Sequence, residues 1–220
     1  GMKKYLLLAM LLIPALSWAQ SEWEIPDFEK KQSVEDTKGE STRKAKKAIL
    51  PRYNVGAVPE IDGKVEWEET FSVPNTDAET LYNRTLEAMS LLIKGKQQTG
   101  RSRISAVNKQ EKIIAANMEE EMVFATSSFA KDFTHFRYSI IAECKDNAVN
   151  VKLCRMTYKY DVGRPEEESY TAEELITDKQ AINKKGTKMF RLNGKFRMKT
   201  IDRKDELFSF FKSRITSPAE

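Results

Sequence analysis

The sequence contains a single histidine, His135, and only two cysteines among 220 residues. One imidazole excludes zinc sites built on two or more histidines, and it leaves any serine or cysteine nucleophile with one possible imidazole base. Phosphate-binding glycine loops and dinucleotide fingerprints are also missing. We therefore expect no metal, no cofactor and no catalytic residue of these types, and we interpret His135 as an ordinary half-exposed strand residue.

Long apolar runs are missing as well, because no stretch approaches the ~20 residues that a membrane-spanning helix needs. The run Tyr5–Leu16 follows Lys3 and Lys4 and precedes Ser17–Ala19, a small-x-small cleavage pattern. These three parts are typical of a secretory signal peptide. We expect residues 1–19 to be an expression scar plus signal peptide, and the protein to cross the inner membrane to the periplasm or cell surface. No cysteine lies at the cleavage point, so we do not expect a lipoprotein.

Composition divides the remaining chain into two parts. Residues 20–50 are mainly charged and small polar, which is typical of a flexible leader. Residues 51–220 suit one domain, with an insert at 161–200 before the last helix. The 37 basic and 33 acidic residues nearly balance, so bulk charge identifies no partner.

The segment 64–95 predicts a strand, a turn and a helix. Val65, Trp67 and Phe71 recur at strand spacing, and an apolar series at helical spacing follows. That series, Tyr82, Leu86, Met89 and Ile93, predicts the face of the helix that meets the sheet. Thr76 with Glu79 predicts a capping box at the helix start.

A hairpin is predicted around an Asp146-Asn147 turn. The turn pairs Cys144 with Val149 and brings the apolar faces of both strands together. In that register Cys144 points inward and Cys154 outward, about five rungs away, so we predict two free thiols. A second hairpin is predicted at 191–196, where Asn-Gly supplies the residues of a tight turn.

The order of elements is strand, helix, four strands, insert, helix. One antiparallel sheet of about five strands with two helices on one face buries these apolar surfaces economically, so the predicted class is α+β. The segments YNVGAVPEIDGKVEWEETF, VPNTDAETLYNR, YTAEELI and KTIDRKDELF resemble a family of secreted Gram-negative bacterial proteins. That family is a domain of unknown function with a TBP-like fold. The resemblance implies the fold but neither an activity nor catalytic residues.

Two surfaces are candidates for binding. The open sheet face is predicted to carry Arg137, Ile141, Lys152, Cys154 and Met156, either as a binding surface or, as we favour, as a floor covered by the insert. The predicted basic hairpin carries Lys184, Lys185, Lys188, Phe190, Arg191, Lys195, Phe196, Arg197 and Lys199. Its positive charge suits an anionic polymer or headgroup, although the acidic segment 161–178 could neutralise it locally.

The function expected from the sequence is a secreted, non-enzymatic binding or assembly module of the bacterial envelope. Its expected partner is an envelope protein, an anionic polymer or a lipid headgroup, and not nucleic acid, because the signal peptide places it outside the cytoplasm. The alternative is an extracytoplasmic hydrolase whose carboxylate and hydroxyl site is not visible in the sequence.

Overall fold

The computed structural model describes residues 48–217. The expected signal peptide and most of the expected leader lie outside the described residues. The elements, in chain order, are η1 (Pro51–Tyr53), β1 (Glu60–Ile61), β2 (Lys64–Val65), β3 (Trp67–Ser72), α1 (Ala78–Ile93), β4 (Arg103–Asn108), β5 (Ile113–Thr126), β6 (Lys131–Lys145), β7 (Ala148–Tyr160), β8 (Glu168–Thr171), α2 (Ala172–Leu175), α3 (Asp178–Ala181) and α4 (Arg191–Thr216).

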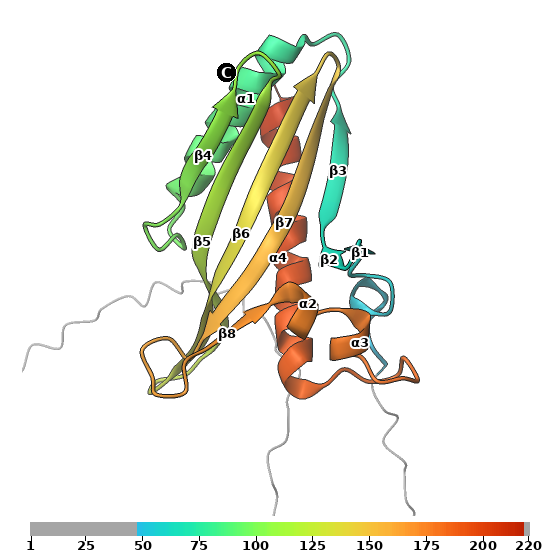
Figure 1. Ribbon diagram of the computed structural model, residues 1–220, viewed down its shortest axis with the longest axis vertical. Helices are drawn as coiled ribbons and strands as arrows, with labels where there is room; N and C mark the ends of the chain where they lie inside the picture. Colours follow the sequence, from blue (N-terminus) through green and yellow to red (C-terminus); the bar gives the residue numbers. More distant parts are fainter. Residues whose placement is uncertain (1–47, 218–220) are drawn as a thin grey trace, which may run out of the picture. The chain divides into compact units, whose positions relative to one another are not determined.

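One antiparallel sheet organises these elements. Its six strands follow the order β3-β7-β6-β5-β4, with β8 paired to the end of β7, while β1 and β2 form a separate ribbon. Helices α1 and α4 lie against one face, and the other face is open toward the viewer in Figure 1. The predicted α+β class with two helices on one face is confirmed, and the main sheet has six strands instead of about five.

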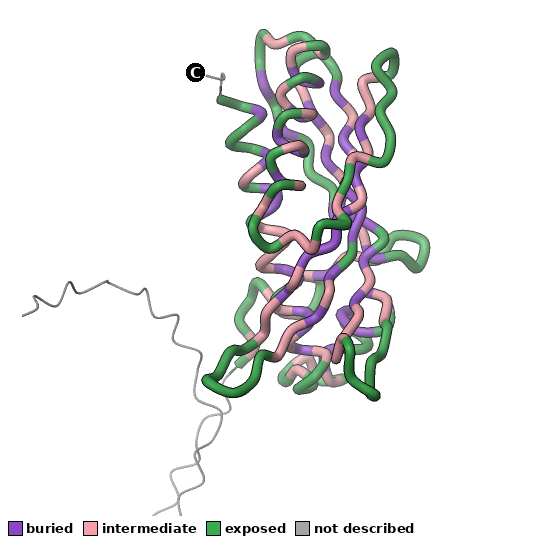
Figure 2. The backbone as a smooth tube through the Cα atoms, turned by 90° about the vertical axis from the view of Figure 1, so that its left-hand side faces the viewer, coloured by how far each residue is buried: buried purple, intermediate pink, exposed green. Residues whose placement is uncertain are grey.

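The core lies between the sheet and the two helices. Buried side chains from β3, β5, β6 and β7 join those of α1 and α4 in one cluster, in which Phe71 packs edge-on against Phe208. In Figure 2, buried stretches run along these elements and exposed stretches mark the loops at both ends. Among the helices of residues 48–217, none is both long and apolar enough to cross a membrane.

The β6–β7 hairpin has the predicted register. Cys144 pairs with Val149, and Asn147 takes the left-handed conformation of the turn at φ +67°. Both cysteines are free thiols, as predicted, and both are buried. The turn also fixes the start of α1, because the Asp146 carboxylate accepts a hydrogen bond from the Ala78 amide at 2.8 Å.

The start of α1 differs from the prediction by one residue. Asp77, not Thr76, is the N-cap, and its side chain accepts a hydrogen bond from the Thr80 amide at 2.8 Å. An aspartate is at least as good a cap as a threonine, since both place an oxygen over the free amides of the first turn. The second predicted capping box, Thr171 with Glu174, is present at the start of α2.

The predicted hairpin at 191–196 is wrong, because these residues form the first turns of α4. Gly194 is needed there for close packing: a Cβ at this position would lie 2.9 Å from the Met189 Cβ. Phe196, Thr200 and Ile201 continue the buried stripe of Leu207, Phe208 and Phe211 toward the N-terminus of the helix. Burial of this long stripe outweighs the local turn preference of Asn-Gly.

The prediction that the insert covers the open sheet face is wrong. Its β8 lengthens the sheet beside β7, and α2 adds Ala172 and Leu175 to the core. Strands β5 and β6 are uncovered toward the viewer in Figure 1. Among the described residues, 48–217, no helix or strand lies over this face of β5 and β6.

Candidate functional site

Strand alternation places a set of polar residues on the open face. Asn117 and Glu119 of β5 lie opposite Ser139 and Arg137 of β6, and the Ser139 hydroxyl donates to the Asn117 side chain at 2.9 Å. The neighbouring residues Met118 and Tyr138 point to the core side and are buried. Alternation thus keeps the apolar face closed while the open face stays polar.

A bulge in β7 adds an arginine to this face. The β6–β7 register shifts between Arg137 and Ser139, and opposite the shift Arg155 has a left-handed backbone at φ +54°. A bulge changes which face each later residue takes. Leu153 and Met156 therefore both face the core, and Arg155 is exposed. The predicted position of Met156 on the open face is wrong for this reason.

Four arginines line one cleft of about 370 Å³ beside the bulge. They are Arg101, Arg103, Arg137 and Arg155, and together they form what we call the arginine cleft. All four are exposed, and Glu119 is the only acidic residue in the lining. Arg103 and Arg155 form no ion pair with any residue in the range 48–217. Four guanidinium groups against one carboxylate leave an excess of positive charge.

Glu119 is buried at the base of the cleft, with 6% of its side chain exposed. The Thr99 hydroxyl donates to its Oε1 at 2.7 Å, Arg137 donates to its Oε2, and Arg101 lies 3.8 Å from Oε1. Burial alone would raise the pKa of this carboxyl. The hydrogen bonds from Thr99 and Arg137, with the charges of Arg137 and Arg101, outweigh burial and lower the pKa. Glu119 is thus a fixed anion that orients Arg137.

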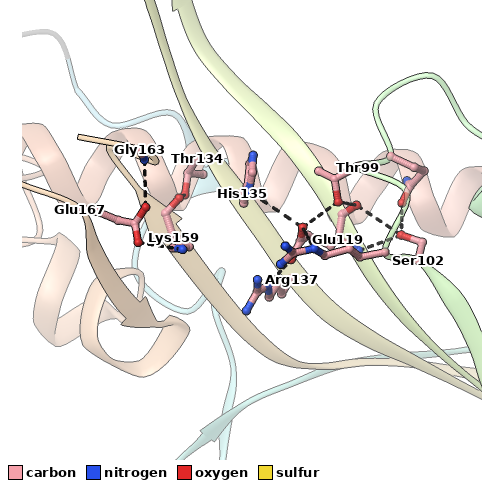
Figure 3. A network of polar contacts seen from close by, with 11 residues as sticks. Thr99, Ser102, Glu119, Thr134, His135, Arg137, Lys159, Gly163 and Glu167 are labelled. Carbon is pink, nitrogen blue, oxygen red and sulfur yellow. Dashed lines mark hydrogen bonds and ion pairs between the residues drawn. The ribbon is translucent and has the colours of Figure 1, made fainter. Parts of the chain in front are cut away.

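The polar network extends along the open face beyond the cleft, as Figure 3 shows. His135 Nδ1 lies 3.9 Å from Glu119 Oε1, and farther along Lys159 pairs with Glu167 at 2.7 Å. On the other side, the Glu119 amide donates to the Ser102 hydroxyl at 2.8 Å. Arg137 also borders a second cleft of about 210 Å³, which Thr157, Lys159 and Tyr170 help to line. Arg137 is therefore shared by both hollows.

The network does not have the geometry of a nucleophilic site. The His135 imidazole makes no hydrogen bond with any residue in the described part of the chain, so no hydroxyl is paired with it. The Thr99 hydroxyl is committed to Glu119, and that of Thr134 donates to the Lys159 carbonyl at 2.9 Å. Within residues 48–217, no group of three His, Cys, Asp or Glu side chains could hold a metal ion.

Of the residues predicted on the open face, the structure brings only Arg137 into the arginine cleft. Lys152 lies 3.4 Å from Glu66 and 3.7 Å from Glu68 and is neutralised there. Cys154 is buried, and burial raises the pKa of its thiol, so it is not a reactive group. Ile141 is half-buried on the same face.

The residues predicted for the basic hairpin separate into two groups. Lys195, Phe196 and Arg197 are structural: Lys195 pairs with Asp132 at 2.9 Å, Phe196 is fully buried, and Arg197 pairs with Asp178 at 2.7 Å. Arg197 also donates to three backbone carbonyls, those of Tyr53, Asn54 and Ile176. The exposed group is Lys184, Lys185, Lys188, Phe190, Arg191 and Lys199.

The sequence did not indicate Arg101, Arg103, Arg155 or Glu119 as site residues. One signal was present, since strict alternation from Val149 and Val151 directs Arg155 into the core. An unpaired arginine cannot remain in a core, so its position marks a break in alternation. The segment 97–102 gives no such signal. It reaches the site because the amide of Thr99 donates to the Glu119 carbonyl at 3.0 Å.

Comparisons with other proteins agree on the fold. Residues 67–159 match the family described as "Domain of unknown function (DUF4468) with TBP-like fold". The crystal structure of a DUF4468 family protein from Bacteroides ovatus is 36% identical, with a TM-score of 0.69 over 76% of this chain and 95% of that one. A TBP-like protein from Parabacteroides distasonis has a TM-score of 0.59 at 18% identity, over 74% of this chain and 99% of that one, and it supports the fold alone. None of the curated proteins matches this chain. The chain belongs to the DUF4468 family, a family of unknown function with a TBP-like fold.

Proposed function

We propose that this protein is a non-enzymatic binding module that acts in the bacterial envelope and holds an anionic group in its arginine cleft. The observation that carries the proposal is the set of four exposed arginines around one carboxylate that is already paired. Guanidinium groups bind phosphate, sulfate and carboxylate groups through paired hydrogen bonds. The signal-peptide pattern of residues 1–19 supports a place outside the cytoplasm, in the periplasm or at the cell surface.

The chemistry of Glu119 favours binding over hydrolysis. A general base works best with a pKa near the working pH, whereas the pKa of Glu119 is lowered and its oxygens are occupied by Thr99 and Arg137. Its hydrogen bond instead holds the Arg137 guanidinium over the cleft. The ligand we infer is an anion with two or more negative charges, free or on an envelope polymer, because one carboxylate offsets one of four arginines.

Isothermal titration at low ionic strength tests this function. The probes are pyrophosphate and a sulfated heparin tetrasaccharide, and the test variant is R137Q/R155Q. Two charge-assisted hydrogen-bonding groups are lost, so we expect at least a tenfold weaker affinity. The matched control is K109Q/K212Q, which removes the same charge from exposed positions outside the cleft and should bind as the wild type does. The proposal would be overturned if the wild type bound neither probe. It would also be overturned if both variants lost the same amount of affinity.

A further inference from the structure

A second surface lies at one end of the sheet, away from the arginine cleft. Eight large apolar side chains are exposed in the described part of the chain, and four of them belong to this end. They are Val55, Phe129, Phe190 and Leu192, with exposed fractions of 61%, 100%, 48% and 40%. We call this surface, together with the cations Lys184, Lys185, Lys188 and Arg191, the basal end.

Contacts between distant segments place the parts of the basal end at the same end of the sheet. The Lys195–Asp132 pair at 2.9 Å joins the first turns of α4 to the start of β6, next to the loop that carries Phe129. Val55 lies beside Gly186, within the loop that carries the lysines. In Figure 1 the β5–β6 loop lies at the lower left, the 183–190 loop at the lower right, and the start of α4 between them. The Phe129 side chain is fully exposed, so packing against the core does not account for an aromatic residue at this position.

The 183–191 part of the basal end, which carries its four cations, is positively charged. Its four cations form no ion pair with any residue between 48 and 217, and all are exposed. Three acidic residues of the insert form ion pairs with cations outside the basal end: Asp161 pairs with Arg164, Glu167 with Lys159, and Asp178 with Arg197. Local neutralisation by the acidic segment, which the sequence suggested, therefore involves other cations.

We propose that the basal end docks on a lipid bilayer that carries anionic headgroups. Lysines near a membrane surface are attracted to anionic lipid at ~1 kcal/mol each, which is about a fivefold gain per residue. An aromatic side chain at the same end of the molecule can enter the boundary between headgroups and acyl chains. Phe129, at a hairpin tip, is the residue in position to enter, while Lys184 and Lys185 contact headgroups. A soluble polyanion would use the same lysines but would gain nothing from Phe129.

Vesicle sedimentation tests docking with the full chain. The vesicles are pure phosphatidylcholine or phosphatidylcholine with 40% phosphatidylglycerol, a composition chosen at roughly the anionic content at which surface potential becomes substantial. We expect binding to the anionic vesicles only, lost at high salt. Phe129→Ser should weaken it about tenfold, because the insertion of one aromatic ring is lost. K184Q/K185Q should weaken it by at least as much.

Matched variants separate docking from the function of the cleft. Leu91→Ser removes an exposed apolar residue outside the basal end, and it should leave vesicle binding unchanged. R137Q/R155Q should also keep vesicle binding, and Phe129→Ser should keep pyrophosphate binding. Absence of binding to anionic vesicles would overturn the proposal. So would equal binding by the wild type and Phe129→Ser, since that result means a polyanion site without insertion.

Discussion

Glu119 and Glu120 are neighbours in β5, yet their carboxylates act on opposite faces of the sheet. Glu119 holds Arg137 on the open face, and Glu120 forms an ion pair with Arg203 of α4 on the core side, with Nε to Oε1 at 2.7 Å. Tyr138 and Gln98 each donate to Glu120 Oε2 at 3.0 Å. Two adjacent acids thus serve different purposes, one at the surface cleft and one in the helix–sheet interface.

Loss of the Glu120 carboxylate should destabilise the fold strongly. Glu120 is 2% exposed and Arg203 14%, so Glu120→Ala leaves a largely buried guanidinium with only the exposed Glu206 as a carboxylate partner. Breaking a buried pair in this way costs about 3–5 kcal/mol. Urea denaturation should show this loss, and E120L/R203M, which removes both charges, should recover most of it. If Glu120→Ala were as stable as the wild type, the Glu120–Arg203 pair would have no structural role.

Acid should reveal the contribution of Glu119. Its pKa is lowered in the folded state from an ordinary ~4.3, so its ionised form stabilises the fold above that pH. The stabilisation is lost as the pH falls through the folded pKa. Glu119→Gln does not titrate, so the difference in unfolding free energy between the two proteins should narrow on acidification. Denaturation curves at pH 7 and below pH 4 measure it, and a difference that widens in acid would contradict the assignment.

The buried face of α1 gives a third prediction. Leu81 is fully buried, whereas Leu86 is partly buried and packs at the margin of the core. Leu81→Ala should therefore cost about 2–5 kcal/mol, and Leu86→Ala clearly less, because the cost follows the burial and the cavity left behind. Chemical denaturation of both variants measures the ranking. Equal losses would mean that Leu86 is as central to the core as Leu81.

The fold was predictable from the sequence where local patterns and burial agree. The register from Cys144 to Val149 follows from alternation on both sides of a two-residue turn, and the structure has it. The centre of the α1 face was less predictable, because Thr85 is fully buried and donates its hydroxyl to the Leu81 carbonyl at 2.7 Å. A threonine satisfied in this way gives no apolar signal. The apolar face predicted from the sequence therefore included the partly buried Leu86 and Ile93 and left out the buried Thr85.

The candidate site was less predictable, for two physical reasons. A bulge is a local change of register, and it placed Arg155 on the open face and Met156 in the core. Burial of charge was the other reason: Arg197 is fully buried and is satisfied by Asp178 and three carbonyls. The hydrogen-bond partners of an arginine cannot be read from the sequence, so an arginine is predicted to lie at the surface. The helix from Arg191 was consequently interpreted as a basic hairpin.

The bulge at Arg155 carries the last prediction. A left-handed backbone costs a residue with a Cβ about 1–2 kcal/mol, and glycine avoids that cost but loses about 0.5–1 kcal/mol through the entropy of the unfolded chain. Arg155→Gly should therefore raise the unfolding free energy by up to about 1.5 kcal/mol while weakening pyrophosphate binding. Arg155→Gln is the matched control, since it removes the charge and keeps the Cβ, and it should bind as weakly as Arg155→Gly without the gain in stability. Urea denaturation and titration of both variants separate strain from charge. If Arg155→Gly is less stable than Arg155→Gln, the backbone at this position stores no strain, and the arginine is not held there at the expense of stability.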